Sequence, residues 1–81
     1  MKIVVNGEER EVAAGATLGE LIDWLSLAPE RIAVEVNREV VRRARWRETV
    51  LAEGDRVEVV HFVGGGSGSR MGRESHRFRT I

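Results

Sequence analysis

The sequence predicts an α+β protein in which a mixed sheet of four to five strands carries one main helix on one face. Three observations lead to this prediction. The apolar pattern of the chain begins and ends with β-branched segments, at residues 2–5 and 56–63. A single helical pattern lies between them, starting at Thr17. The remaining apolar segments are short and alternate in strand fashion, so two layers of structure are expected.

Length and composition exclude several classes of protein. The 81 residues suffice for one small domain, and the absence of cysteine excludes disulfide scaffolds and cysteine-based metal sites. No apolar run approaches the ~20 residues that cross a bilayer. The apolar stretch at residues 3–5 is too short for the core of a signal peptide. We therefore expect a cytoplasmic protein with no membrane partner.

The first two strands are predicted to form a hairpin. Residues 2–5 are Lys-Ile-Val-Val, and the Asn6-Gly7 pair that follows is typical of a two-residue turn because both residues tolerate a positive φ. Residues 8–12 then return as a polar strand, which we expect at an edge of the sheet.

The helix is predicted from its first turn and its apolar spacing. Thr17 followed by Glu20 is a capping box, in which each side chain satisfies a free amide at the start of the helix. Trp24 lies at the margin of the apolar face, and Pro29 requires the helix to end near Leu27. The apolar face has the i, i+3, i+4, i+7 spacing of a helix and consists of Leu18, Leu21, Ile22 and Leu25.

The second half of the chain returns to strands. Alternation over residues 32–36 predicts a half-buried strand, residues 37–39 a turn, and Val40 and Val41 a short strand. Trp46 stands in a polar segment, and we interpret it as a cover over the edge of the core. After a turn at 53–55, the last strand has Val57 and Val59 on one face and Glu58, Val60 and Phe62 on the other.

The end of the domain is marked by a change in composition. Gly64-Gly65-Gly66-Ser67-Gly68-Ser69 follows the last apolar strand directly. Such a segment cannot pack a core. We therefore predict a domain over residues 1–63, a flexible glycine tail at 64–66 and a disordered basic appendage at 67–81. The zero net charge divides into −3 for residues 1–66 and +3 for the appendage. Four arginines are too weak a basic footprint to predict nucleic-acid binding.

Side chains with catalytic potential are scarce. The two histidines, His61 and His76, fall short of a zinc ligand set, and no serine lies in a nucleophile motif. The glycine run is followed by neither the Lys-Ser/Thr pair nor the helix that a phosphate loop needs. We expect neither a metal site nor catalytic residues, and therefore a protein that is not an enzyme.

Two longer segments carry a family resemblance. They are Ala33-Val34-Glu35-Val36-Asn37-Arg38-Glu39-Val40-Val41 and the run from Leu51-Ala52-Glu53-Gly54-Asp55 through Val63 into Gly64-Gly65-Gly66, with Trp46 between them. Over residues 1–66 the chain resembles the sulfur-carrier proteins of thiamin biosynthesis, the ThiS family. This resemblance implies the ubiquitin-like β-grasp fold, with the first and last strands parallel at the centre of the sheet.

The resemblance also implies a function. The family's terminal glycine corresponds to Gly66, and Gly64 and Gly65 form a thin arm before it. An adenylating enzyme would use ATP to activate the glycine carboxylate, and a persulfide donor would convert it to a thiocarboxylate. The thiocarboxylate would then donate sulfur to thiazole synthase. The carrier itself is implied to bind no cofactor, and Val60 and Phe62 are candidates for the surface that partners contact.

The 15 residues after Gly66 depart from the family pattern. They imply a trimming protease, a cloning remnant, a fusion to thiazole synthase, or a relative without the carrier function. Cleavage after Gly65 would also leave a diglycine end. The alternative functions are a sulfur carrier for molybdopterin or amino-acid synthesis, and a β-grasp binding or regulatory module.

Overall fold

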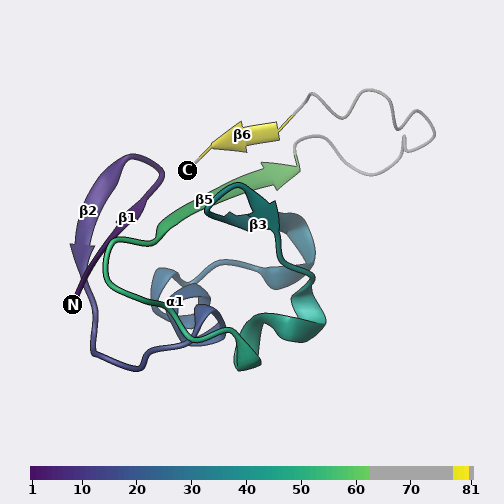
Figure 1. The fold of residues 1–81 in the computed structure, drawn as a ribbon. Helices are drawn as coiled ribbons and strands as arrows, with labels where there is room; N and C mark the ends of the chain where they lie inside the picture. Colours follow the sequence, from purple (N-terminus) through teal and green to yellow (C-terminus); the bar gives the residue numbers. More distant parts are fainter. Residues whose placement is uncertain (63–77, 81) are drawn as a thin grey trace.

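The structure is a computed structural model, and it describes residues 1–62 together with the backbone of 78–80. A mixed sheet with the strand order β2-β1-β5-β3-β4 lies over the α-helix, and β6 pairs with β5 (Figure 1). The strands are β1 (Lys2–Val5), β2 (Glu8–Glu11), β3 (Ile32–Val36), β4 (Glu39–Val40), β5 (Arg56–Phe62) and β6 (Phe78–Thr80). The helix is α1 (Leu18–Leu25), and 3₁₀ helices span Pro29–Arg31 and Arg43–Glu48.

The two central strands are the first and the last of the predicted domain. β1 and β5 run parallel, with Val4 opposite Arg56 and Val5 opposite Val57. β2 lies antiparallel to β1 at the edge of the sheet, as predicted. This arrangement confirms the β-grasp topology that the resemblance implied.

Two tight turns set the register of the hairpins. Asn6 and Gly7 have φ of 50° and 84°, and Asn37 and Arg38 have φ of 52° and 72°. A two-residue turn with positive φ at both positions matches the twist of the strands that it joins. The second turn places Glu39 opposite Val36, so β4 is Glu39–Val40 and starts one residue earlier than predicted.

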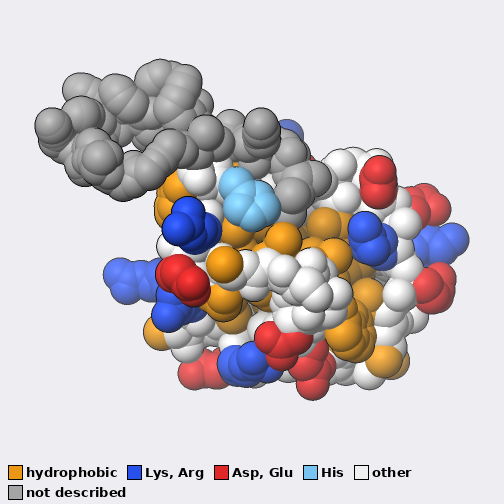
Figure 2. All heavy atoms as spheres, turned by 180° about the vertical axis from the view of Figure 1, so that it is seen from behind, with side chains coloured by type: hydrophobic (Ala, Val, Ile, Leu, Met, Phe, Trp, Pro, Cys, Tyr) orange, Lys and Arg blue, Asp and Glu red, His pale blue; other side chains and the backbone are white. Residues whose placement is uncertain are grey.

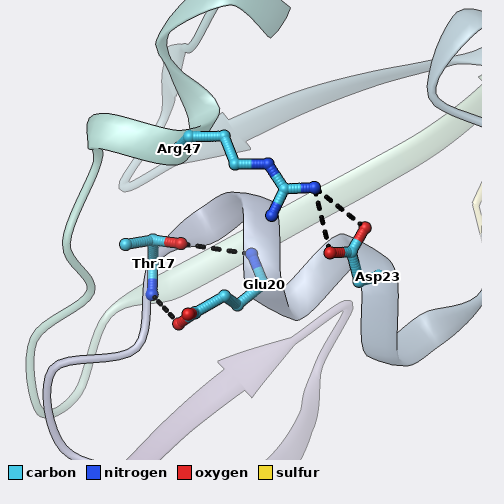
Figure 3. A network of polar contacts seen from close by, with 4 residues as sticks. All are labelled: Thr17, Glu20, Asp23 and Arg47. Atoms are coloured by element: carbon cyan, nitrogen blue, oxygen red, sulfur yellow. Dashed lines mark hydrogen bonds and ion pairs between the residues drawn. The ribbon is translucent and has the colours of Figure 1, made fainter.

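The start of α1 is fixed by the predicted capping box (Figure 3). The Glu20 amide donates to the Thr17 hydroxyl at 3.2 Å, and the Thr17 amide donates to the Glu20 carboxylate at 3.0 Å. The helix ends at Leu25, two residues before the predicted end, because Ser26 adopts the left-handed conformation with φ of 57°.

The neighbouring 3₁₀ helix is joined to α1 by an ion pair. Arg47 donates from one guanidinium nitrogen to both carboxylate oxygens of Asp23, at 2.9 and 3.2 Å (Figure 3). Gly19 allows this approach, because a Cβ at that position would lie 3.0 Å from the Arg47 side chain.

One core fills the space between the sheet and α1. It includes the helix residues Leu18, Leu21 and Ile22 and the strand residues Ile3, Val5, Ile32, Val34, Val57 and Val59. Trp46 is 5% exposed and donates from its indole nitrogen to the Val41 carbonyl at 2.8 Å. Its predicted role as a cover of the core is therefore confirmed. Trp24, at the margin of the helix face, is 55% exposed.

The structure adds one strand that the sequence did not predict. Residues 78–80, within the segment expected to be a disordered appendage, form β6 and pair with β5. Residues 63–77 and 81 lie outside the described residues. Within the described part of the chain, no helix has the length and apolar character that crossing a bilayer requires.

Candidate functional site

The candidate site is the end of β5, where the chain leads toward the glycine run. The two faces of this strand differ as the alternation predicted. Val57 and Val59 are completely buried against the helix side, whereas Glu58 is exposed and Val60 is half-buried on the other face. We call the sheet face opposite α1 the open face. Phe62 lies on it and is 47% exposed.

Three apolar residues lie together on the open face beside the end of β5. Val60 lies directly opposite Ala33 of β3, and Phe62 follows Val60 on the same face of β5. We call Ala33, Val60 and Phe62 the apolar end. The structure thus brings the two predicted contact residues together and adds Ala33. The alternation of residues 32–36 predicted that Ala33 faces away from the core, but a single alanine does not by itself indicate a contact surface.

The other end of the open face is charged. Glu35 and Glu58 lie opposite each other on β3 and β5, and like charges in this position repel. Together with Asn37, Arg38 and Arg56 they line a shallow hollow. The open face therefore has a charged end and an apolar end, and the apolar end holds Phe62, two positions before the glycine run in the sequence. Seen from behind the view of Figure 1, the described residues expose hydrophobic side chains beside charged ones (Figure 2).

The start of β5 is held by residues of the two family motifs. The Asn37 side-chain amide donates to the Asp55 carboxylate at 3.0 Å, and the Arg56 backbone amide donates to the Asn37 side-chain oxygen at 3.0 Å. The Ala52 amide donates to the other Asp55 oxygen at 2.8 Å. The Asn and the Asp of these motifs thus hold the start of β5, which is a positioning role.

The middle of β5 is held by Asn6 from the first hairpin. The Val59 amide donates to the Asn6 side-chain oxygen at 2.8 Å, and the Asn6 side-chain nitrogen donates to the Val59 carbonyl at 3.2 Å. Sequence reasoning identified Asn6 only as a turn residue. No local signal could have found this contact, because its partners lie 53 residues apart.

The predicted reactive residue and its arm, Gly66, Gly65 and Gly64, lie outside the described residues. The last described residue of β5 is Phe62, two positions before the first of these glycines. Among the described residues, no group of three or more His, Asp or Glu side chains is placed to hold a metal ion. The described part of the site therefore consists of a backbone strand and an apolar surface.

Comparison with known proteins places this geometry in a family. The family model described as the ThiS family matches residues 3–66. A crystal structure of the thiamine biosynthesis protein ThiS from Geobacter metallireducens superposes with a TM-score of 0.71 at 38% identity, covering 82% of this chain and 100% of that chain. The sulfur carrier protein ThiS of Escherichia coli is 29% identical over 66 residues, which are 82% of this chain and 100% of that protein.

A further relative is much longer. A thiazole synthase of Magnetococcus marinus is 52% identical over 66 residues, which make up 82% of this chain. The matched segment makes up 20% of that enzyme, so the chain spans about a fifth of the length of this relative. Segments similar to this domain therefore occur both as whole proteins and within a larger protein named as a thiazole synthase.

Proposed function

The chain belongs to the ThiS family of sulfur carrier proteins in thiamine biosynthesis, and we propose that Gly66 is the residue that carries the sulfur. The membership supports the sulfur-carrier prediction and the expectation of a carrier rather than an enzyme. The observation that supports Gly66 is the extent of the family match, which ends at this residue. β5 leads toward it from a firmly held core.

The proposed chemistry takes place at a carboxylate that is unreactive by itself. A carboxylate oxygen of Gly66 attacks the α-phosphorus of ATP on an activating enzyme, and pyrophosphate leaves. A persulfide sulfur then attacks the acyl carbon and displaces AMP. A thiol supplies the two electrons that break the remaining sulfur–sulfur bond, which leaves a thiocarboxylate on the glycine. Glycines suit this role because the absence of Cβ atoms lets the segment approach a reactive centre closely.

This chemistry requires a free carboxylate at Gly66. The sequence continues for 15 residues after Gly66, so the bond to Ser67 must first be hydrolysed. We propose that a protease makes this cut in the cytoplasm. The similarity to a thiazole synthase supports an enzyme of that kind as the acceptor of the sulfur.

The apolar end is the proposed contact surface for these partners. Phe62 exposes 47% of its surface on the open face, close in sequence to the glycine run, and Ala33 and Val60 extend the same surface. Exposed apolar surface of this kind is typical of protein–protein contacts. A partner that covers the apolar end would hold the glycines at its own active site.

The test is an activation assay with two truncated chains. Residues 1–66 and residues 1–64 are each mixed with the activating enzyme, ATP and labelled pyrophosphate. We expect exchange of pyrophosphate into ATP with 1–66 and none with 1–64. After addition of a persulfide donor and a thiol, the intact mass of 1–66 should increase by the difference between sulfur and oxygen.

The controls separate the proposal from its alternatives. Equal exchange with 1–66 and 1–64 would show that Gly66 is not the reacting residue, and a 1–65 chain then tests Gly65. No exchange with any chain would contradict the carrier chemistry and favour a binding or regulatory module. The thiocarboxylate form is then incubated with thiazole synthase and, separately, with a molybdopterin-forming enzyme. The enzyme that takes up the sulfur is the acceptor.

A further inference from the structure

One edge of β5 changes its partner along the strand. β1 pairs with β5 only at its start, through Val4 opposite Arg56 and Val5 opposite Val57. The Asn6 amide then donates to the Val57 carbonyl at 2.8 Å. The Asn6 side chain takes both the amide and the carbonyl of Val59, at 2.8 and 3.2 Å. Asn6 is thus the last residue of the β1–β2 hairpin that bonds this edge of β5. Its side chain makes the final contact, because its backbone already forms the turn.

The next backbone groups on this edge belong to His61. In a strand the amide and carbonyl of one residue point to the same edge, and successive residues alternate between the two edges. Val57 and Val59 bond toward β1, so His61 presents its amide and carbonyl in that direction as well. The β1–β2 hairpin has turned back at Gly7 and does not reach this position.

β6 lies where the hairpin stops. It runs antiparallel to β5, with Thr80 opposite Val60, Arg79 opposite His61 and Phe78 opposite Phe62 (Figure 1). Because His61 points toward this edge, the His61–Arg79 pair is the one that exchanges both backbone hydrogen bonds. The C-terminal segment therefore fills the first position on the β5 edge that neither β1 nor Asn6 occupies.

We propose that the β5 edge at His61 is a strand-acceptor site and that its ligand is this chain's own C-terminal segment, Phe78–Thr80. Recognition is through the main chain, as in other cases where an extended segment adds to a sheet. An unpaired strand edge is a template for pairing with other chains, and a strand from the same chain removes that hazard.

The site has a consequence that rests on the proposed function. β6 lies alongside Val60–Phe62, the residues that lead into the glycine run. While β6 is paired, it covers the edge of β5 next to the glycine run, which an activating enzyme must bind. Hydrolysis after Gly66 turns β6 from a tethered segment into a separate peptide, and its local concentration falls. Trimming would therefore free the edge as well as the carboxylate.

The first test measures amide hydrogen exchange by NMR in the full chain and in residues 1–66. The whole Geobacter metallireducens protein aligns with 82% of this chain and is folded, so we expect residues 1–66 to fold without the remaining residues. We expect the His61 amide to exchange at least about tenfold more slowly in the full chain, because β6 closes that edge. The Val60 amide, which points toward β3, should exchange equally in both. Equal rates for His61 in the two chains would overturn the proposal.

Two proline variants of the full chain give a matched pair. Arg79→Pro removes the amide that donates to His61, whereas Thr80→Pro removes an amide that points away from β5. We expect His61 protection to be lost in Arg79→Pro and kept in Thr80→Pro. Arg79→Ala should also keep it, since the backbone makes the contact. Loss of protection in Arg79→Ala alone would contradict main-chain recognition.

The second test addresses the consequence for activation. A synthetic peptide of residues 67–81 is added to residues 1–66 in the pyrophosphate-exchange assay. We expect the peptide to slow exchange, and the same peptide with Arg79→Pro to have no effect. Equal rates with both peptides, combined with His61 protection in the full chain, would reject the masking role and keep the strand-acceptor site. Absence of exchange without any peptide would reject the proposed function and leave the hydrogen-exchange result standing.

Discussion

The first and second halves of β5 make an instructive comparison. Arg56–Val59 is bonded on one edge by β1 and Asn6 and on the other by β3, and its inward side chains are completely buried. Val60–Phe62 is bonded by β3 and by β6, and its apolar side chains reach the open face. One continuous strand thus runs from the centre of the core to a more exposed end, which precedes the glycine run in the sequence.

The difference shows how a small carrier separates stability from function. Burial against α1 and pairing on both edges hold the first half, so substitutions there should lower the free energy of unfolding. The second half lies outside the deepest part of the core, so substitutions there should change partner binding with little effect on the fold. The boundary between the halves is set by the end of β1 at Val5 and by Asn6, whose side chain bonds the backbone of Val59.

The largest effect on stability is expected from Val59→Ala. Val59 is completely buried, and its truncation removes core contacts and leaves a cavity. We expect the free energy of unfolding to fall by about 2 kcal/mol. The same substitution at the adjacent, half-buried residue, Val60→Ala, should lower it by less than about 1 kcal/mol. Urea denaturation of both variants measures the difference, and equal losses would contradict the comparison.

Asn6→Gly should have an intermediate effect. Glycine accepts the positive φ of this position, so the variant removes only the side chain that bonds Val59. The backbone groups of Val59 lose both side-chain partners, and we expect the free energy of unfolding to fall by about 1–1.5 kcal/mol. Thermal or urea unfolding gives the value. Asn37→Gly, at the other positive-φ turn, is the matched control for the added flexibility of glycine.

The Asn37 control itself loses the contacts to Asp55 and Arg56, which are exposed. The two variants are therefore best compared residue by residue. Faster amide exchange at Val59 is expected in Asn6→Gly and not in Asn37→Gly. An unchanged Val59 amide in Asn6→Gly would show that the side-chain contact does not hold the middle of β5.

The smallest effect on stability is expected from Phe62→Ser. Phe62 is 47% exposed on the open face, so the free energy of unfolding should change by less than about 1 kcal/mol. The proposed contact with the activating enzyme should weaken by a larger factor, seen as a higher concentration of residues 1–66 needed for half-maximal pyrophosphate exchange. A cooperative loss of the fold instead would place Phe62 in the core.

The sequence predicted those features that depend on neighbouring residues. Thr17 and Glu20 cap α1 from three positions apart, and Asn6-Gly7 makes its turn without help from elsewhere. The alternation along residues 56–63 correctly separated the buried face of the last strand from its open face. The predicted helix end was two residues too late, because the left-handed conformation of Ser26 has no clear sequence signal.

The glycine run and the family resemblance indicated, from the sequence alone, that the end of β5 is the functional part of the molecule. The roles of Gly64, Gly65 and Gly66 stay predictions, as do the contact roles of Val60 and Phe62. What the resemblance did not reveal is why the Asn and Glu-Gly-Asp positions matter to the site. Asn37 and Asp55 contact each other and hold the start of β5, the strand that precedes the glycine run in the sequence.

The sequence by itself determined the main elements other than β6 and the two faces of the strands, because capping, turns and alternation act over a few residues. Its motifs also indicated the family. Only the tertiary structure decided which backbone groups of β5 are taken by β1, which by Asn6, and which by β6. Those pairings join residues as far as 53 positions apart, and they depend on where each strand stops relative to its neighbours. A short sequence pattern carries no record of such distances, since they arise only when the strands are assembled into one sheet.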